Sequence, residues 1–297
     1  MYEAYFNLKE KPFSLSPDPR YIYLTAQHME ALAKCEYSIS QKMGISIIYG
    51  DIGAGKTSLA RRLWEKFASN PQYNFAMLVH PNYPSAFQLV KEIKREFGND
   101  KPRRSISDEI DDFRAFLIRE HNLGKTNVLV IDEAQNLRHS LFEILRVLLN
   151  FETNTQKLLQ IVLFGQNELG IKIDREPELK DRVTIFGALT SLTIEDAKKM
   201  INYRWQVAGG NKLPFEDAAV ETIFKYSRGL PRKICKLCDN ALIRAASSQL
   251  TAINTDIVEY VAKEVRLTTE LDDQPAKKIG RKKKAIENPK IIDQSTL

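Results

Sequence analysis

Several features are scarce in this chain of 297 residues, and each scarcity excludes a class of protein. Three cysteines fit a reducing compartment better than a disulfide framework. No stretch approaches the roughly 18 apolar residues of a membrane span. The first residues lack the basic and then apolar pattern of a signal peptide. We therefore expect a cytoplasmic protein without membrane contact.

Two of the cysteines, Cys235 and Cys238, form a single C-x-x-C pair inside a segment of helical periodicity. A zinc site would need a second pair or nearby histidines, and the surrounding sequence offers neither. Free cysteine usually packs as a small apolar side chain. The pair is therefore predicted to be buried and structural.

Positive charge is concentrated near the C-terminus. The formal net charge is +6, and residues 277–284 alone contain six basic residues and no acid. Without those six, 38 basic residues face 38 acidic ones, so the rest of the chain is neutral. A polar, charged stretch without periodicity is typical of a disordered or partner-ordered tail.

The most informative motif is a P-loop, Gly-Asp-Ile-Gly-Ala-Gly-Lys-Thr. The apolar run 45–49 precedes it and the amphipathic run 58–67 follows, which is the strand–loop–helix context that the motif requires. Glycines let the backbone approach phosphates, and loop N–H groups attract the anion. The lysine reaches the β- and γ-phosphates and the threonine hydroxyl ligates Mg²⁺. The predicted nucleotide contacts are Gly50, Asp51, Ile52, Gly53, Ala54, Gly55, Lys56, Thr57 and Ser58.

Strand and helix patterns alternate through the first two thirds of the chain and then give way to helices. This order predicts an α/β fold, a parallel sheet flanked by helices, followed by a small all-helical lid domain and a basic tail. Strands are expected at 45–49, 74–79, 127–131, 159–164 and 183–186. The expected domains are an extended N-terminal segment (1–25) packed on the core, a P-loop core (26–190), a lid (191–265) and the tail (266–297).

Polar residues follow two of the predicted strands. Asp132 and Glu133 come directly after the apolar strand 127–131, beside the expected phosphate site. Asp132 suits Mg²⁺ binding through water, and Glu133 suits general-base activation of the attacking water. After the next strand, the amide of Gln166 or Asn167 is a candidate to contact the γ-phosphate or the water, and Asn167 is the preferred one.

Two arginine positions complete the predicted site. Arg182 precedes the strand 183–186 and is the candidate to reach a neighbouring subunit's γ-phosphate, with Arg175 as its substitute. Arg232 follows a Gly-Leu-Pro turn in the first turn of a lid helix. It is predicted to lie over the phosphates and to couple the lid to the nucleotide.

Together these motifs resemble those of AAA+ ATPases. More narrowly, Lys11-Pro12-Phe13, the run 17–20 (Pro-Asp-Pro-Arg), the run 164–169 (Phe-Gly-Gln-Asn-Glu-Leu) and the run 235–242 are similar to the ExeA/TnsC-like branch. The resemblance covers about residues 1–265. It implies Walker A roles for Lys56 and Thr57, Walker B roles for Asp132 and Glu133, a sensor 1 role for Gln166 or Asn167, and a sensor 2 role for Arg232. It also implies that the segment 21–24 lies near the adenine, although its rings suit core packing equally well.

That branch contains two kinds of protein. ExeA-type secretion ATPases continue into a membrane span, whereas TnsC-like regulators assemble with ATP as rings or filaments on double-stranded DNA and recruit a transposase. The missing apolar span and the basic tail favour the second kind, a homo-oligomer with ATP and Mg²⁺ as cofactors and a transposase and target-selection adaptor as partners. A secretion-type ATPase and a recruitment scaffold with negligible hydrolysis remain the alternatives. Backbone contacts to DNA are expected from Lys101, Arg103, Arg104 and Lys125, and transposase contacts from 266–297.

Overall fold

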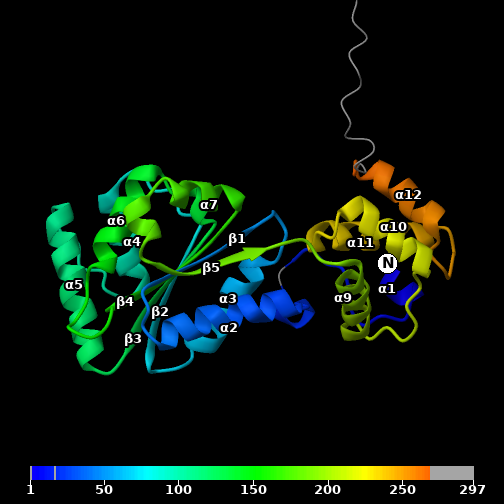
Figure 1. Ribbon diagram of the computed structural model, residues 1–297. Helices are drawn as coiled ribbons and strands as arrows, with labels where there is room; N and C mark the ends of the chain where they lie inside the picture. Colours follow the sequence, from blue (N-terminus) through cyan, green and yellow to red (C-terminus); the bar gives the residue numbers. More distant parts are fainter. Residues whose placement is uncertain (1, 17, 268–297) are drawn as a thin grey trace, which may run out of the picture.

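The chain forms a sheet domain and a helical lid that lie side by side (Figure 1). The computed structural model describes residues 2–16 and 18–267, so the basic stretch 277–284 and nearly all of the predicted tail lie outside the described residues. The expected α/β class with a helical lid is confirmed. Within the described part of the chain, no helix combines the length and the apolarity needed to cross a membrane.

The sheet has five parallel strands in the order β2-β3-β4-β1-β5. Their sequences are apolar runs because both faces of the sheet are covered by helices. All of β4 and nearly all of β1 and β3 are buried, whereas β2 and β5 at the edges are partly exposed. The strands are β1 (Ile45–Gly50), β2 (Tyr73–Val79), β3 (Thr126–Asp132), β4 (Leu159–Gly165) and β5 (Val183–Leu189).

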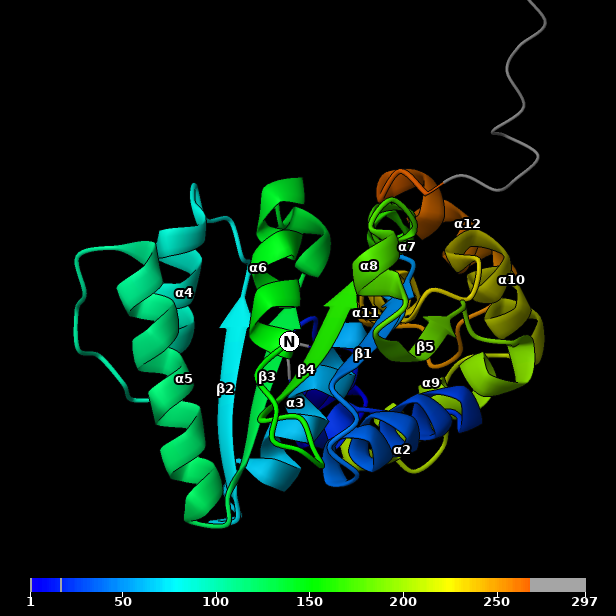
Figure 2. The same cartoon turned by 60° about the vertical axis from the view of Figure 1, so that its left-hand side comes forward.

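Helices cover the sheet in two layers. One layer packs α4, α5 and α6 on the face that carries Ile45, Leu129 and Ile161, and the other packs α2 and α3 on the face that carries Val130 and Val162. Figure 2 shows α4 and α5 near the β2 edge and the lid beyond the opposite edge. The bounds are α2 (Ala26–Ser40), α3 (Lys56–Phe67), α4 (Ala86–Glu96), α5 (Ile106–Asn122), η2 (Ala134–Asn136), α6 (His139–Leu149), α7 (Asn167–Asp174) and α8 (Pro177–Lys180).

The N-terminal segment differs from the expectation, because it belongs to the lid. Residues 2–5 are helical, and the rings of Tyr2 and Phe13 are 1% and 0% exposed inside the lid core. The Tyr2 hydroxyl bonds to Asp239, and Lys9 N donates to Ala208 O at 2.9 Å. A small domain buries only a limited part of its surface on folding, so the rings of the N-terminal segment stabilise the lid by enlarging its apolar core. The remaining elements are α1 (Tyr2–Tyr5), η1 (Pro19–Tyr21), α9 (Ile194–Val207), α10 (Asp217–Ser227), α11 (Pro231–Ser247) and α12 (Thr255–Glu264).

The two cysteines of the C-x-x-C pair are buried in α11, also in the lid core. Burial raises the pKa of both thiols, so they stay protonated near neutral pH. Among the described residues, no group of three or more histidine, cysteine or acidic side chains is placed to hold a metal ion.

A buried ionic cluster joins α4 to α5 and holds the loop between them. The side chains of Lys94 and Glu109 are each 1% exposed and form an ion pair, and Lys94 Nζ also lies 2.7 Å from Asp112 Oδ2. The same groups bind the loop backbone: Lys94 Nζ donates to Lys101 O at 3.2 Å, and Arg103 N donates to Glu109 Oε1 at 3.0 Å. The loop 98–105 is therefore held by two buried charges of opposite sign.

Replacing Glu109 with glutamine is expected to lower the free energy of unfolding by about 3 kcal/mol. The buried Lys94 ammonium then loses the negative charge of Glu109 and keeps only that of Asp112. Urea denaturation at neutral pH measures the change. The matched control is Asp108→Asn, which removes an exposed carboxylate from the same helix turn and should cost less than about 0.5 kcal/mol. Equal effects of the two substitutions would contradict a buried ion pair that stabilises the fold.

Candidate functional site

The P-loop connects β1 to α3 at the carboxyl edge of the sheet. Gly53 and Gly55 have φ values of +84° and +100°, which residues other than glycine rarely adopt. Gly55 is also the N-cap of α3, so the loop turns sharply into the helix. The motif therefore occupies the strand–turn–helix geometry that its phosphate-binding function needs.

Lys56 lies inside this loop with 6% of its surface exposed. Its Nζ donates to Gly50 O at 2.8 Å and to Asp51 O at 2.7 Å. Burial lowers the pKa of Lys56 from its ordinary value, and the nearby carboxylates of Glu133 and Asp132 oppose that shift. The ammonium is thus held under the loop, close to two acids.

Asp132 ends β3 and is 1% exposed. Burial raises the pKa of its carboxyl group, whereas a hydrogen bond with the Thr57 side chain and another from Glu133 N, at 2.9 Å, oppose the rise. A hydroxyl and a carboxylate in contact, next to a phosphate cradle, form the oxygen donor set that Mg²⁺ prefers. The structure thus brings together Thr57 and Asp132, the two residues predicted to bind Mg²⁺.

Glu133 has a left-handed backbone (φ 54°, ψ 36°), which is uncommon for a residue other than glycine. Two amides bind its carboxylate: Gln135 Nε2 at 2.5 Å and Gln166 Nε2 at 3.3 Å, both to Oε2. Gln135 Oε1 also accepts from Gln166 N at 3.0 Å. The turn after β3 and the end of β4 therefore hold this acid in one orientation.

The two amide candidates after β4 are separated by the structure. Gln166 faces Glu133, whereas the exposed Asn167 side chain donates to Asp51 Oδ1 at 2.7 Å on the outer side of the P-loop. The preferred candidate, Asn167, therefore has no hydrogen bond to the acid, and its neighbour does. Gln166 is the N-cap of α7, but its side chain makes no capping hydrogen bond and binds Glu133 instead.

Arg232 approaches the P-loop from the lid. A methyl group placed on Gly53 would come within 3.1 Å of Arg232 Cβ, so the first turn of α11 packs directly on the loop. A cavity of about 340 Å³ opens here between the two domains. Its lining includes Ser14, Leu15, Ser16, Pro19, Ile22, Gly53, Gly55, Lys56, Thr57, Ser58, Arg61, Glu133, Gln166, Arg204 and Arg232.

The N-terminal segment forms one wall of this cavity. Pro19 and Ile22 line it, whereas the Tyr21 ring packs with the Arg20 and Arg204 guanidinium carbons 5.7 and 5.8 Å from its centroid. Of the segment 21–24, the apolar side chain of Ile22 thus faces the cavity and the Tyr21 ring serves packing.

Arg182 lies far from its own P-loop. Val183 pairs with Ile45 at the start of β1, and the six-residue strand places the loop roughly 17 Å away at the other end. Arg182 Nη1 donates to Arg146 O at 3.1 Å and to Asn150 Oδ1. This arginine cannot reach the nucleotide site of its own chain.

Arg175 differs from Arg182 in its contacts. It caps the C-terminus of α7 and is exposed, and in the described part of the chain its side chain has no hydrogen-bond or ion-pair partner. Its guanidinium is therefore more accessible to a second subunit.

The four predicted DNA contacts divide into two pairs. Arg103 bonds to Asp112, and Lys125 Nζ lies 2.9 Å from Glu120 Oε2. Lys101 and Arg104 are exposed on the loop 98–105 and make no side-chain ion pair within the described residues. Their charges are the more accessible to a phosphate.

Comparison with known proteins agrees with this geometry. Residues 39–170 match the family model described as AAA domain. CDC6P from Pyrobaculum aerophilum superposes with a TM-score of 0.65 at 18% identity, covering 86% of this chain and 70% of that one. For Drosophila ORC bound to DNA the TM-score is 0.64 at 16% identity, with 88% and 66% covered. The chain therefore shares the fold of these structures, and its P-loop lies within the residues that match the AAA domain model.

The chain is also similar in sequence to general secretion pathway protein A of Aeromonas hydrophila. The two are 35% identical over 256 residues, which is 82% of this chain and 45% of that protein. The chain thus spans less than half the length of this relative.

Proposed function

We propose that this chain binds ATP with Mg²⁺ between the sheet domain and the lid and hydrolyses it. The observation that carries the proposal is convergence on one cavity. Lys56, the Thr57–Asp132 pair, Glu133 and Arg232 line or adjoin it, although they come from α3, from the end of β3 and the turn after it, and from α11. A phosphate cradle, a metal-ligand pair, a base and a lid arginine are the parts that phosphoryl transfer to water needs.

In this proposal each side chain has one task. Lys56 and the loop amides bind the phosphates, and Thr57 and Asp132 hold Mg²⁺, which would neutralise charge on the transferring phosphoryl group. Glu133 accepts the proton of the attacking water, and Gln135 and Gln166 orient its carboxylate. Arg232, in the first turn of α11, contacts the phosphates and so couples the position of the lid to the bound nucleotide.

We further propose that the site is completed by a second copy of the chain. Arg182 is hydrogen-bonded within its own subunit, whereas the exposed Arg175 side chain has no partner among the described residues, which favours Arg175 as the arginine that acts in trans. An arginine supplied to the γ-phosphate from outside stabilises the transition state. ATP would then control assembly, because the nucleotide lies between copies.

The leading proposal for the purpose of this assembly is an oligomer on double-stranded DNA that recruits a transposase with a target-selection adaptor. It is supported by the TnsC-like motifs and by the fold likeness to an ORC chain whose structure was determined bound to DNA. Lys101 and Arg104 are the accessible cations, and backbone contacts of this kind need no base readout.

A second candidate is an envelope-associated secretion ATPase that acts on a protein complex, and the similarity to general secretion pathway protein A favours it. Duplex DNA would then have no effect on assembly, and the protein would co-sediment with membranes. A third arrangement, a recruitment scaffold that hydrolyses negligibly, is separated by steady-state ATPase rates with and without DNA.

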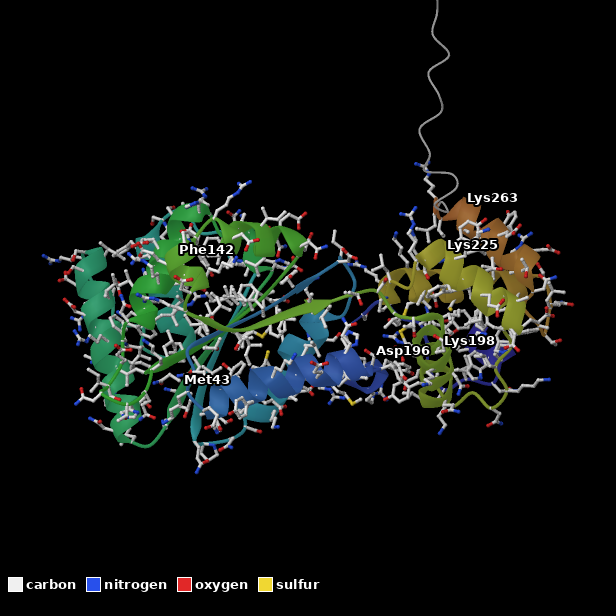
Figure 3. All side chains as sticks on the ribbon, viewed as in Figure 1. Met43, Phe142, Asp196, Lys198, Lys225 and Lys263 are labelled. Atoms are coloured by element: carbon white, nitrogen blue, oxygen red, sulfur yellow. The ribbon has the colours of Figure 1, made fainter. Side chains whose placement is uncertain are left out.

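Electron microscopy with ATP and duplex DNA tests the leading proposal directly: rings or filaments on DNA are expected. The double variant Lys101→Ala/Arg104→Ala should reduce the slope of log affinity against log salt by about 1.8, since each lost phosphate contact accounts for about 0.9. The matched control is Lys225→Ala/Lys263→Ala on the lid (Figure 3). Monomers alone, without DNA retained at low salt, would refute the DNA proposal and favour the secretion candidate.

A further inference from the structure

His28 lies under the P-loop although it is distant from it in sequence. It is the third residue of α2 and is 4% exposed. Its side chain and that of Thr25, the N-cap, form a capping box at the start of the helix. The histidine lies outside the P-loop motif and outside the acid pair after β3.

The hydrogen bonds of the ring fix its tautomer. Thr25 N–H points at Nδ1 (3.4 Å), and the Thr25 hydroxyl lies 2.7 Å from the same nitrogen. On the other side, Nε2 lies 2.7 Å from Ala54 O. A backbone amide only donates and a carbonyl only accepts, so Nδ1 is the acceptor and Nε2 carries the hydrogen. The ring therefore donates from Nε2–H to the P-loop carbonyl of Ala54.

That donor constrains the peptide between Ala54 and Gly55. In a planar trans peptide the C=O and N–H groups point in opposite directions. Holding Ala54 O toward His28 therefore turns Gly55 N–H away from the ring, toward the side of the loop where Gly53, Gly55 and Lys56 line the cavity. If this peptide flipped, a carbonyl oxygen would face the phosphates instead of an amide.

The ring also requires glycine at position 55. A methyl group on Gly55 would lie 2.8 Å from His28 Nε2, and the φ of +100° already disfavours any side chain there. The histidine and the glycine thus fit each other, and Ala54 itself is buried. Two independent contacts, one polar and one steric, join α2 to the same peptide.

We propose that His28 is a positioning residue that holds the Ala54–Gly55 peptide with its N–H directed at the nucleotide phosphates. This inference rests on the proposed ATP-binding function. It assigns α2, which contributes no residue to the P-loop motif, the task of preorganising the cradle before the nucleotide arrives. The competing role is structural, in which His28 only caps α2 and fills space.

Two substitutions separate these roles. His28→Gln places an amide nitrogen near the position of Nε2 and keeps a donor for Ala54 O. His28→Asn is shorter, keeps a polar group beside Thr25 and leaves Ala54 O without its donor. Glutamine at this third helical position can also complete the capping box, so ATP affinity has to be compared with melting temperature. A positioning role predicts that His28→Asn loses ATP affinity beyond any loss that its melting temperature explains, whereas a capping role predicts that affinity follows melting temperature in both variants.

The experiment measures ATP affinity, KM, kcat and melting temperature for the full chain and both variants. We expect His28→Asn to raise the Kd and KM for ATP about 10-fold, since a buried carbonyl is left unsatisfied. His28→Gln should stay within about 3-fold. Unchanged affinity in His28→Asn, or an equal loss in both variants that follows their melting temperatures, would overturn the inference.

Two further outcomes also test the positioning role of His28. If His28→Asn does not fold, His28→Gln decides alone, and an affinity loss much above 3-fold in a folded His28→Gln protein overturns the inference. If the wild-type chain binds no ATP, the proposed function fails and this inference fails with it. Wild-type binding with unaffected variants refutes the positioning role alone.

Discussion

Replacing Lys56 with alanine is expected to weaken ATP binding about 100-fold and to prevent ATP-dependent assembly. The ammonium is enclosed by the P-loop, where it donates to Gly50 O and Asp51 O, and charge-assisted hydrogen bonds to phosphate are the strong ones. Folding has already removed water from the Lys56 ammonium, and this burial lowers its pKa. A bound phosphate would therefore supply negative charge to an ammonium that the nearby carboxylates neutralise only in part. Titration with a fluorescent ATP analogue and light scattering measure the two effects.

The control for this variant is Lys66→Ala on the same helix. Lys66 is exposed at the last turn of α3, where it pairs with Glu36, so its removal should leave nucleotide affinity unchanged. Melting temperatures confirm that both variants fold. ATP binding at wild-type strength by Lys56→Ala would refute the assignment of the P-loop.

Replacing Glu133 with glutamine is expected to lower kcat by about 10²- to 10⁴-fold while ATP affinity and assembly persist. Glutamine keeps an oxygen that accepts the hydrogen bonds of Gln135 and Gln166, so the geometry of the turn survives. It cannot take a proton from water. Single-turnover hydrolysis, measured beside nucleotide binding, separates the chemical step from affinity.

An exposed acid on the lid, Glu259→Gln, is the matched control and should leave kcat unchanged. A Glu133→Gln protein that hydrolyses ATP at the wild-type rate would require another base. A variant that instead loses affinity would show that Glu133 acts on binding, through its field at Lys56.

Much of the fold could be predicted because its signals are local. The apolar runs that become β1, β3 and β4 are buried on both faces, and polar residues mark where they end. The periodicity of apolar residues likewise predicts the helices after residue 191. Predictions were less accurate where tertiary packing competes with propensity: β5, expected over 183–186, extends to Leu189.

The site was predictable only in part. Motif residues such as Lys56, Asp132 and Glu133 lie at strand ends whose positions are visible in the sequence. The choice between Gln166 and Asn167 depends on which amide the first turn of α7 directs at Glu133, and spacing does not reveal it. The contacts of Gln135 with Glu133 and of His28 with Ala54 follow from no spacing in the sequence, although the Thr25 cap marks the start of α2.

The sequence by itself determined that this chain has a P-loop, a following acid pair on a buried strand and a helical second domain, because those features depend on residues adjacent in the chain. Tertiary structure decided three other matters. The sheet order places β4 between β3 and β1, the N-terminal rings complete the core of the lid, and His28 binds the carbonyl of Ala54. Each joins segments far apart in sequence, where burial and hydrogen bonding in three dimensions select the partner.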